Sequence, residues 1–156
     1  SESNSKQIIK LLDFKLTNNQ NQIIDEINTD LRSKNKMFRL LQGDVGSGKT
    51  IIALICAINV IQSGFQVAFM APTGILAEQH FNLSKKIYRG LNIKFELLIG
   101  NTESFKKKLI LNDLKKNKIN IIFGTHALFQ ELDDFLIELI YLLSEFKYAF
   151  IHGWVN

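Results

Sequence analysis

The chain has a single cysteine, a single proline and no long uninterrupted run of apolar residues. One cysteine forms no internal disulfide, which suits a reducing cytoplasm, and Cys56 lies in an apolar stretch where a small core residue is expected. No stretch reaches the ~18 apolar residues that a membrane helix needs. The polar residues 1–6 contain no signal-peptide core. These absences favour a cytoplasmic globular protein.

Chain length and net charge say little more about the kind of protein. A chain of 156 residues predicts one domain with a sizeable core. Its 46% hydrophobic and 22% charged residues are typical of soluble domains. The net charge of +4 mildly favours polyanionic partners without identifying one. No internal repeat or low-complexity linker divides the chain.

The strongest chemical signal is the segment that reads G-x-x-x-x-G-K-T, formed by Gly43, Asp44, Val45, Gly46, Ser47, Gly48, Lys49 and Thr50. Its glycines allow the main chain to wrap closely around phosphate groups and present backbone N–H donors to them. The Lys49 ammonium is placed to reach the β- and γ-phosphates, and the Thr50 hydroxyl is placed to ligate Mg²⁺. The segment predicts a nucleotide-binding site with Lys49 and Thr50 as candidate catalytic residues.

The flanking residues agree with this interpretation. An apolar run at 37–41 predicts a buried strand before the loop, and 51–61 predicts an apolar helix that ends at Gly64. The amino end of that helix would direct its dipole at a bound anion. A transporter ATPase or a nucleotide kinase would need a signature loop or an acceptor-site lid, and the sequence contains neither.

Short apolar segments alternate with amphipathic ones along the chain. This pattern predicts a parallel sheet covered by helices on both faces, an α/β three-layer sandwich. The expected helices are 17–33, 49–63, 75–89 and 102–116, and the expected strands are 38–41, 66–70, 93–99 and 119–123, with a helical turn near 127.

Two further motifs each follow a predicted strand: APTGILAEQH at 71–80 and GTHALFQ at 124–130. Ligands bind at the carboxyl ends of strands in open α/β sheets, where backbone N–H groups can hold a nucleic-acid phosphate without reading its sequence. Taken alone, each segment is equally a plain strand-to-helix turn.

Together and in this order, the three motifs resemble the first motor domain of the RecG family, ATP-dependent DNA helicases of superfamily 2 that remodel branched DNA at stalled forks and Holliday junctions. The transcription-repair coupling factor has a similar series, but Ser47, Ala71 and the ILAEQH tail fit RecG better. The resemblance covers 14–130. It implies a P-loop NTPase (RecA-like) fold, ATP and Mg²⁺ as cofactors and DNA as partner.

The resemblance also implies contacts for the base of the nucleotide. Phe14, Thr17 and Gln20 look like the family's adenine-recognition element, in which the Gln20 amide pairs with the adenine edge through one donor and one acceptor. The alternative is that Thr17 is only a helix N-cap and Gln20 a solvated helix residue. The sequence leaves both open.

The residues that the resemblance places along the DNA path are Thr73, Gly74, Thr125 and His126. Gly74 stands where the family usually has a polar residue, which loosens the turn. A histidine beside a strand end is more often a hydrogen-bonding or packing residue than a titrating one. Their expected partner is the DNA backbone.

The sequence departs from the family after Gln130, where no Asp-Glu-x-His follows to hold Mg²⁺ and activate water. Asp133 and Asp134 come too early, and the strand expected at 147–151 carries no carboxylate. We therefore expect a domain at 14–131 between an N-terminal segment, 1–13, and a divergent apolar segment, 132–156. The sheet would be incomplete at its C-terminal end, with the second motor domain and the DNA-wedge domain missing.

Such a chain should bind ATP with little turnover. The alternative is a non-catalytic remnant or interaction fragment with a vestigial pocket. The lysines at 106–108, 115, 116 and 118 are interrupted by Glu103 and Asp113. Leu109, Ile110 and Leu114 would supply a core stripe, which favours a solvated outer helix face over a DNA-binding patch.

Overall fold

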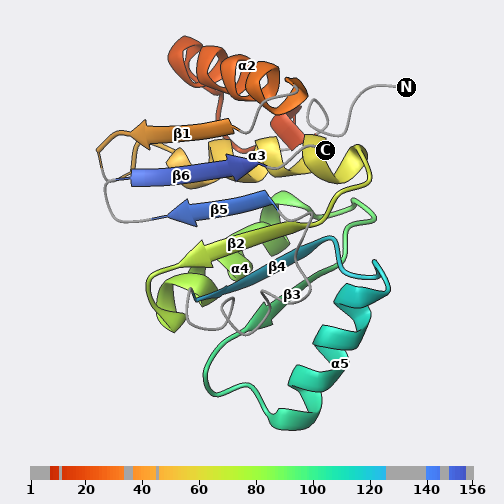
Figure 1. Ribbon diagram of the computed structural model, residues 1–156. Helices are drawn as coiled ribbons and strands as arrows, with labels where there is room; N and C mark the ends of the chain where they lie inside the picture. Colours follow the sequence, from red (N-terminus) through yellow and green to blue (C-terminus); the bar gives the residue numbers. More distant parts are fainter. Residues whose placement is uncertain are drawn as a thin grey trace.

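The computed structural model describes residues 8–10, 12–33, 37–44, 46–125, 140–144 and 148–153. Its helices and strands alternate along most of the chain (Figure 1), as the hydrophobic pattern predicted. In chain order they are α2 (Asn18–Arg32), β1 (Met37–Gln42), α3 (Lys49–Gln62), β2 (Val67–Ala71), α4 (Gly74–Ile87), β3 (Phe95–Leu98), α5 (Ser104–Lys115), β4 (Ile121–Thr125), β5 (Ile140–Ser144) and β6 (Tyr148–Gly153).

The strands form one sheet in the order β1-β6-β5-β2-β4-β3. Strand β6 is antiparallel to both of its neighbours, β1 and β5, whereas β5, β2, β4 and β3 pair in parallel. The other five strands therefore run in one direction and end at the same edge, called here the carboxyl edge. The predicted mainly parallel α/β sheet is confirmed.

Alternation along the strands divides the core into two halves. Phe69 and Phe123 point to one face, where they join a cluster that includes Leu54 and Ile55 of α3. The neighbouring residues of β2 and β4 point to the other face and pack with Ile110 of α5. Helices on both faces of the sheet produce the predicted three layers.

The structure has the strand expected at 147–151 as β6, but the sequence predicted neither β5 nor the antiparallel pairing of the two strands. Only three residues separate these strands, and a parallel connection needs a dozen or more. The two strands therefore pair as antiparallel neighbours and lie between β1 and β2. The predicted helical turn near 127 and the proposed boundary at 131 lie outside the described residues.

Helix α3 is buried on nearly every side, because seven consecutive residues, 52–58, are shielded from solvent. This explains why its sequence is apolar without a polar stripe. No helix among the described residues is both long and apolar enough to cross a membrane.

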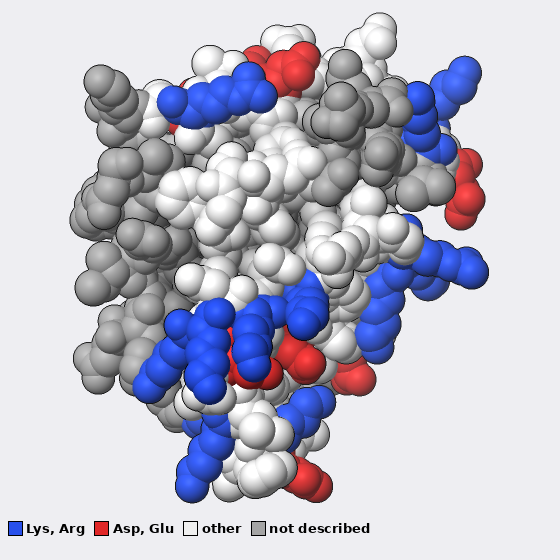
Figure 2. All heavy atoms as spheres, turned by 90° about the vertical axis from the view of Figure 1, so that its right-hand side faces the viewer, with Lys and Arg blue, Asp and Glu red and all other residues white. Residues whose placement is uncertain are grey.

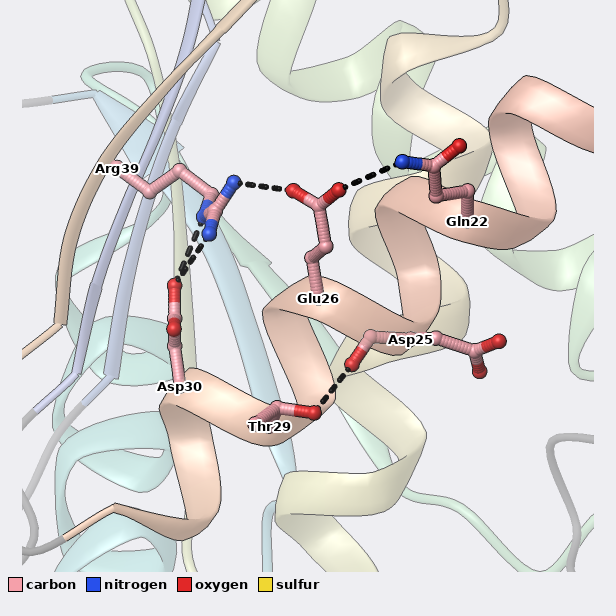
Figure 3. Close-up of polar contacts among 6 residues, drawn as sticks. All are labelled: Gln22, Asp25, Glu26, Thr29, Asp30 and Arg39. Atoms are coloured by element: carbon pink, nitrogen blue, oxygen red, sulfur yellow. Dashed lines mark hydrogen bonds and ion pairs between the residues drawn. The ribbon is translucent and has the colours of Figure 1, made fainter.

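Helix α2 lies beside β1 and is tied to it by one arginine (Figure 3). The Arg39 guanidinium donates to Asp30 Oδ2 and Glu26 Oε2, each at 2.8 Å, and these bonds raise its pKa above the usual value. Asn59 of α3 also donates to Asn28 Oδ1 at 2.8 Å. These bonds fix the position of α2 along β1 and α3.

We predict that Arg39→Met lowers the free energy of unfolding by about 1 kcal/mol, because two charge-assisted hydrogen bonds are lost from a partly exposed site. The loss should shrink in about 1 M NaCl, where the ion pairs are screened. Urea unfolding followed by circular dichroism measures both values. The control is Arg32→Met on the exposed end of α2, which should change little, and an equal loss in both variants would contradict this assignment.

Candidate nucleotide-binding site

The glycine-rich loop connects β1 to α3 at the carboxyl edge of the sheet. Gly46 and Gly48 have φ angles of +83° and +86°, a region that side chains with a Cβ rarely adopt. A Cβ on Gly48 would also lie 2.6 Å from Gln20 Nε2. These two glycines are therefore required by the shape of the loop. Val45, which precedes Gly46, lies outside the described residues.

Lys49 is the first residue of α3, and its side chain folds back over the loop. Its Nζ donates to the main-chain oxygens of Gly43 and Asp44 at 2.6 and 2.7 Å and to Ser47 Oγ at 3.3 Å. The ammonium is thus held at the mouth of the loop by neutral acceptors. A phosphate oxygen, being charged, would be a stronger acceptor than these carbonyls.

The amino end of α3 opens directly from the loop. Gly48 is its N-cap and supplies no side-chain hydrogen bond, so side chains do not cap the first N–H groups of α3. Uncapped N–H donors and the helix dipole suit an anion. Thr50, half-buried in the same turn, is the candidate Mg²⁺ ligand. The described residues contain no cluster of three metal-binding side chains, so phosphate and water would have to complete its coordination.

Gln20 contacts the loop in a way that the sequence did not predict. Its Nε2 donates to the main-chain oxygen of Ser47 at 2.9 Å, across 27 residues of sequence. Its Oε1 accepts from the Thr17 backbone N–H at 2.9 Å, while Gln20 N donates to Thr17 Oγ1 at 3.2 Å. The start of α2 is thereby joined to the glycine-rich loop.

These contacts bear on the two interpretations of Thr17 and Gln20. Thr17 is the N-cap of α2, and together with Gln20 it forms a capping box. Both ends of the Gln20 amide have partners within the protein, so the residue is more than a solvated helix residue. Phe14, 46% exposed, lies three residues before Thr17. The assignment of Phe14, Thr17 and Gln20 to adenine stays a prediction.

Three of the four residues assigned to DNA, Thr73, Gly74 and Thr125, lie at the same edge of the sheet. In the parallel register of β2 and β4, Ala71 is opposite Thr125, so Thr73 follows β2 close to the end of β4. Thr73 caps α4 by accepting from Leu76 N at 3.3 Å, and Gly74 begins that helix without a positive φ. His126 lies outside the described residues.

Three titratable side chains outside the loop, two of them buried and His80 half-buried, have pKa values shifted by burial. Burial raises the pKa of the Cys56 thiol to about 12, as befits the core residue that the sequence predicted. Tyr88 is buried and donates to the Leu54 carbonyl at 2.9 Å, and burial raises its pKa. Burial lowers the pKa of His80, whose ring packs on Phe69 at 5.1 Å. None of these three side chains belongs to the loop.

Comparison with known proteins agrees with the motifs. The DEAD/DEAH box helicase family matches residues 17–149, most of the chain. The chain is 46% identical over 127 residues to the ATP-dependent DNA helicase RecG of Thermotoga maritima, covering 81% of this chain and 16% of the relative. It is 41% identical over 145 residues to the RecG of Borreliella burgdorferi, covering 93% and 21%.

A solved structure, described as RecG bound to a three-way DNA junction, has a similar fold. It matches with a TM-score of 0.78 and 46% identity, over 81% of this chain and 17% of that one. The chain therefore spans about a fifth or less of the length of these relatives. The predicted resemblance to RecG is confirmed, and the chain belongs to the DEAD/DEAH box helicase family.

Proposed function

We propose that this chain is the ATP-binding part of a motor that remodels branched DNA, as in fork reversal and Holliday junction branch migration. The observation that carries the proposal is the loop itself. Gly46 and Gly48 curve the main chain, Lys49 holds an ammonium over it, and α3 begins without a side-chain cap. This arrangement suits the polyphosphate of MgATP, with Thr50 as the Mg²⁺ ligand.

The proposed nucleotide and DNA contacts share one edge of the sheet. Thr73, Gly74, Thr125 and His126 would hold a DNA backbone beyond the ends of β2 and β4. Strands β6 and β5 separate β1 from β2, so the loop and Thr73 stand about three strand spacings, or ~14 Å, apart. A movement of the loop on ATP binding could therefore be transmitted along this edge of the sheet to the residues that would hold the DNA. Such a motor would work in the cytoplasm.

Binding and turnover need different groups. Lys49, Thr50 and the loop N–H groups suffice to bind MgATP, but hydrolysis also needs a positioned water and neutralisation of transition-state charge. The sequence after Gln130 contains no Asp-Glu-x-His to position that water. We propose that the 156-residue chain binds ATP and hydrolyses it slowly, if at all.

Replacement of Lys49 by alanine should weaken ATP binding about tenfold to a hundredfold, because charge-assisted hydrogen bonds to phosphate are lost. Titration with a fluorescent ATP analogue measures the change. Lys86→Ala on the exposed face of α4 removes the same charge away from the loop and should bind as the parent chain does. Unchanged affinity in Lys49→Ala would refute the proposed site.

Replacement of Gln20 by alanine should weaken binding of ATP about tenfold and of GTP much less, because only adenine offers the matching donor and acceptor. Competition titrations with both nucleotides distinguish the roles of Gln20. If it only orders the loop through Ser47, the two affinities should fall equally, and the adenine assignment would be wrong. Gln22→Ala is the matched control, since that amide donates to Glu26 Oε1 within α2 itself and, among the described residues, not to the loop.

Phosphate release from MgATP should stay near background with the 156-residue chain, whether or not a three-way DNA junction is added. The same assay on the full-length relative from Thermotoga maritima provides the positive control. DNA-stimulated turnover comparable to that of the relative would show that residues outside the motif identified here supply the missing carboxylate.

A further inference from the structure

The positive charge of this chain is concentrated in one short region. Between residues 94 and 118 there are seven lysines and three carboxylates, a net charge of +4 that equals that of the whole chain. The positive and negative charges of all other residues therefore sum to zero. Figure 2 shows Lys and Arg gathered in a band across the lower part of one face, where α5 lies.

The lysines of this band come from three places that the fold brings together: the residue before β3, helix α5, and the turn between α5 and β4. Lys94 precedes β3, and its main-chain oxygen accepts from Asn120 N at 2.7 Å, while its N–H donates to Asn120 Oδ1 at 2.9 Å. Lys94 therefore lies beside the turn from α5 to β4 that carries Lys118. The basic band is defined here by six exposed lysines: Lys94, Lys106, Lys108, Lys115, Lys116 and Lys118.

The carboxylates nearby neutralise the band only in part. Lys106 is 4.0 Å from Glu96 and Lys118 is 3.6 Å from Asp113, and all four side chains are at least 39% exposed. Exposed pairs of this kind contribute little and are readily exchanged for a stronger anion. The band can therefore bind an external polyanion without breaking a buried interaction.

A solvated helix face explains the lysines one by one, but not the apolar side chains among them. Phe105 and Leu109 are one turn apart on α5 and are 73% and 48% exposed. An aromatic ring flanked by lysines suits nucleic acid, since bases stack on the ring while the ammonium groups contact phosphates. The twelve residues of α5 extend over about 18 Å. That length matches about five phosphates of one strand.

We propose that the basic band is a second DNA-binding surface, which contacts the phosphodiester backbone of single or double strands without reading sequence. Its four lysines at 94 and 115–118 lie at the edge of the sheet where β3 and β4 begin, opposite the carboxyl edge that holds the loop. A single junction could then touch the motor at two edges. The inference rests on the proposed function in so far as both assign DNA to this chain.

The test compares two variants with the same change of charge. K108E/K116E reverses two lysines of the basic band, and K15E/R32E reverses two exposed cations, one just before α2 and one at its last residue. Fluorescence anisotropy with single-stranded and duplex oligonucleotides measures affinity at several salt concentrations. K108E/K116E should lose about tenfold in affinity, and its plot of log affinity against log salt should flatten by about two units. K15E/R32E should change neither value as much.

Equal losses in the two variants, or no loss in K108E/K116E, would overturn the proposal. Tighter binding of poly-glutamate than of either oligonucleotide would also overturn it and favour an acidic protein partner. If K108E/K116E loses more affinity for one oligonucleotide than for the other, that difference shows whether the basic band prefers single-stranded or duplex DNA. The fluorescent ATP analogue separates this proposal from the proposed function, because K108E/K116E should bind it normally. If that variant does not fold, K94Q/K118Q takes its place under the same criteria.

Discussion

The candidate nucleotide site is built around the ammonium of Lys49 and the main-chain oxygens of Gly43 and Asp44 that hold it. Those oxygens converge because Gly46 and Gly48 adopt a backbone conformation that other residues resist. The same turn leaves the amino end of α3 without a side-chain cap, while the buried residues 52–58 pack the body of that helix against the sheet.

Helix α2 connects this loop to the rest of the domain. At its amino end Gln20 donates to the Ser47 main chain, and towards its other end Asp30 and Glu26 accept from Arg39 of β1. A displacement of the loop would also displace the start of α2, because the Gln20 amide bonds to Ser47 in the loop and to Thr17 at the helix N-cap. The G-x-x-x-x-G-K-T loop is therefore one part of a larger structural unit. That unit also includes α2 and the ion pairs of Arg39 with Glu26 and Asp30.

Charge is distributed unevenly between the two edges of the sheet. The carboxyl edge presents glycine, threonine and backbone groups, which suit close contact with phosphates, whereas the net positive charge lies along α5 and at the opposite edge. The carboxyl edge is thus suited to short-range hydrogen bonds with phosphates, and the basic band to long-range attraction of a polyanion. Among the described residues, the buried titratable groups Cys56 and Tyr88 belong to the core between the sheet and α3.

The sequence by itself determined the alternation of helices and strands, the glycine-rich loop between β1 and α3, and the family, because periodicity and the G-x-x-x-x-G-K-T spacing are local. Even the capping box of Thr17 and Gln20 is a local pattern. Only the tertiary structure decided that Gln20 reaches Ser47, that β6 runs antiparallel beside β1, and that Lys94 joins the lysines of α5. These contacts join residues 26 to 116 positions apart, and the packing of the sheet and its helices brings them together.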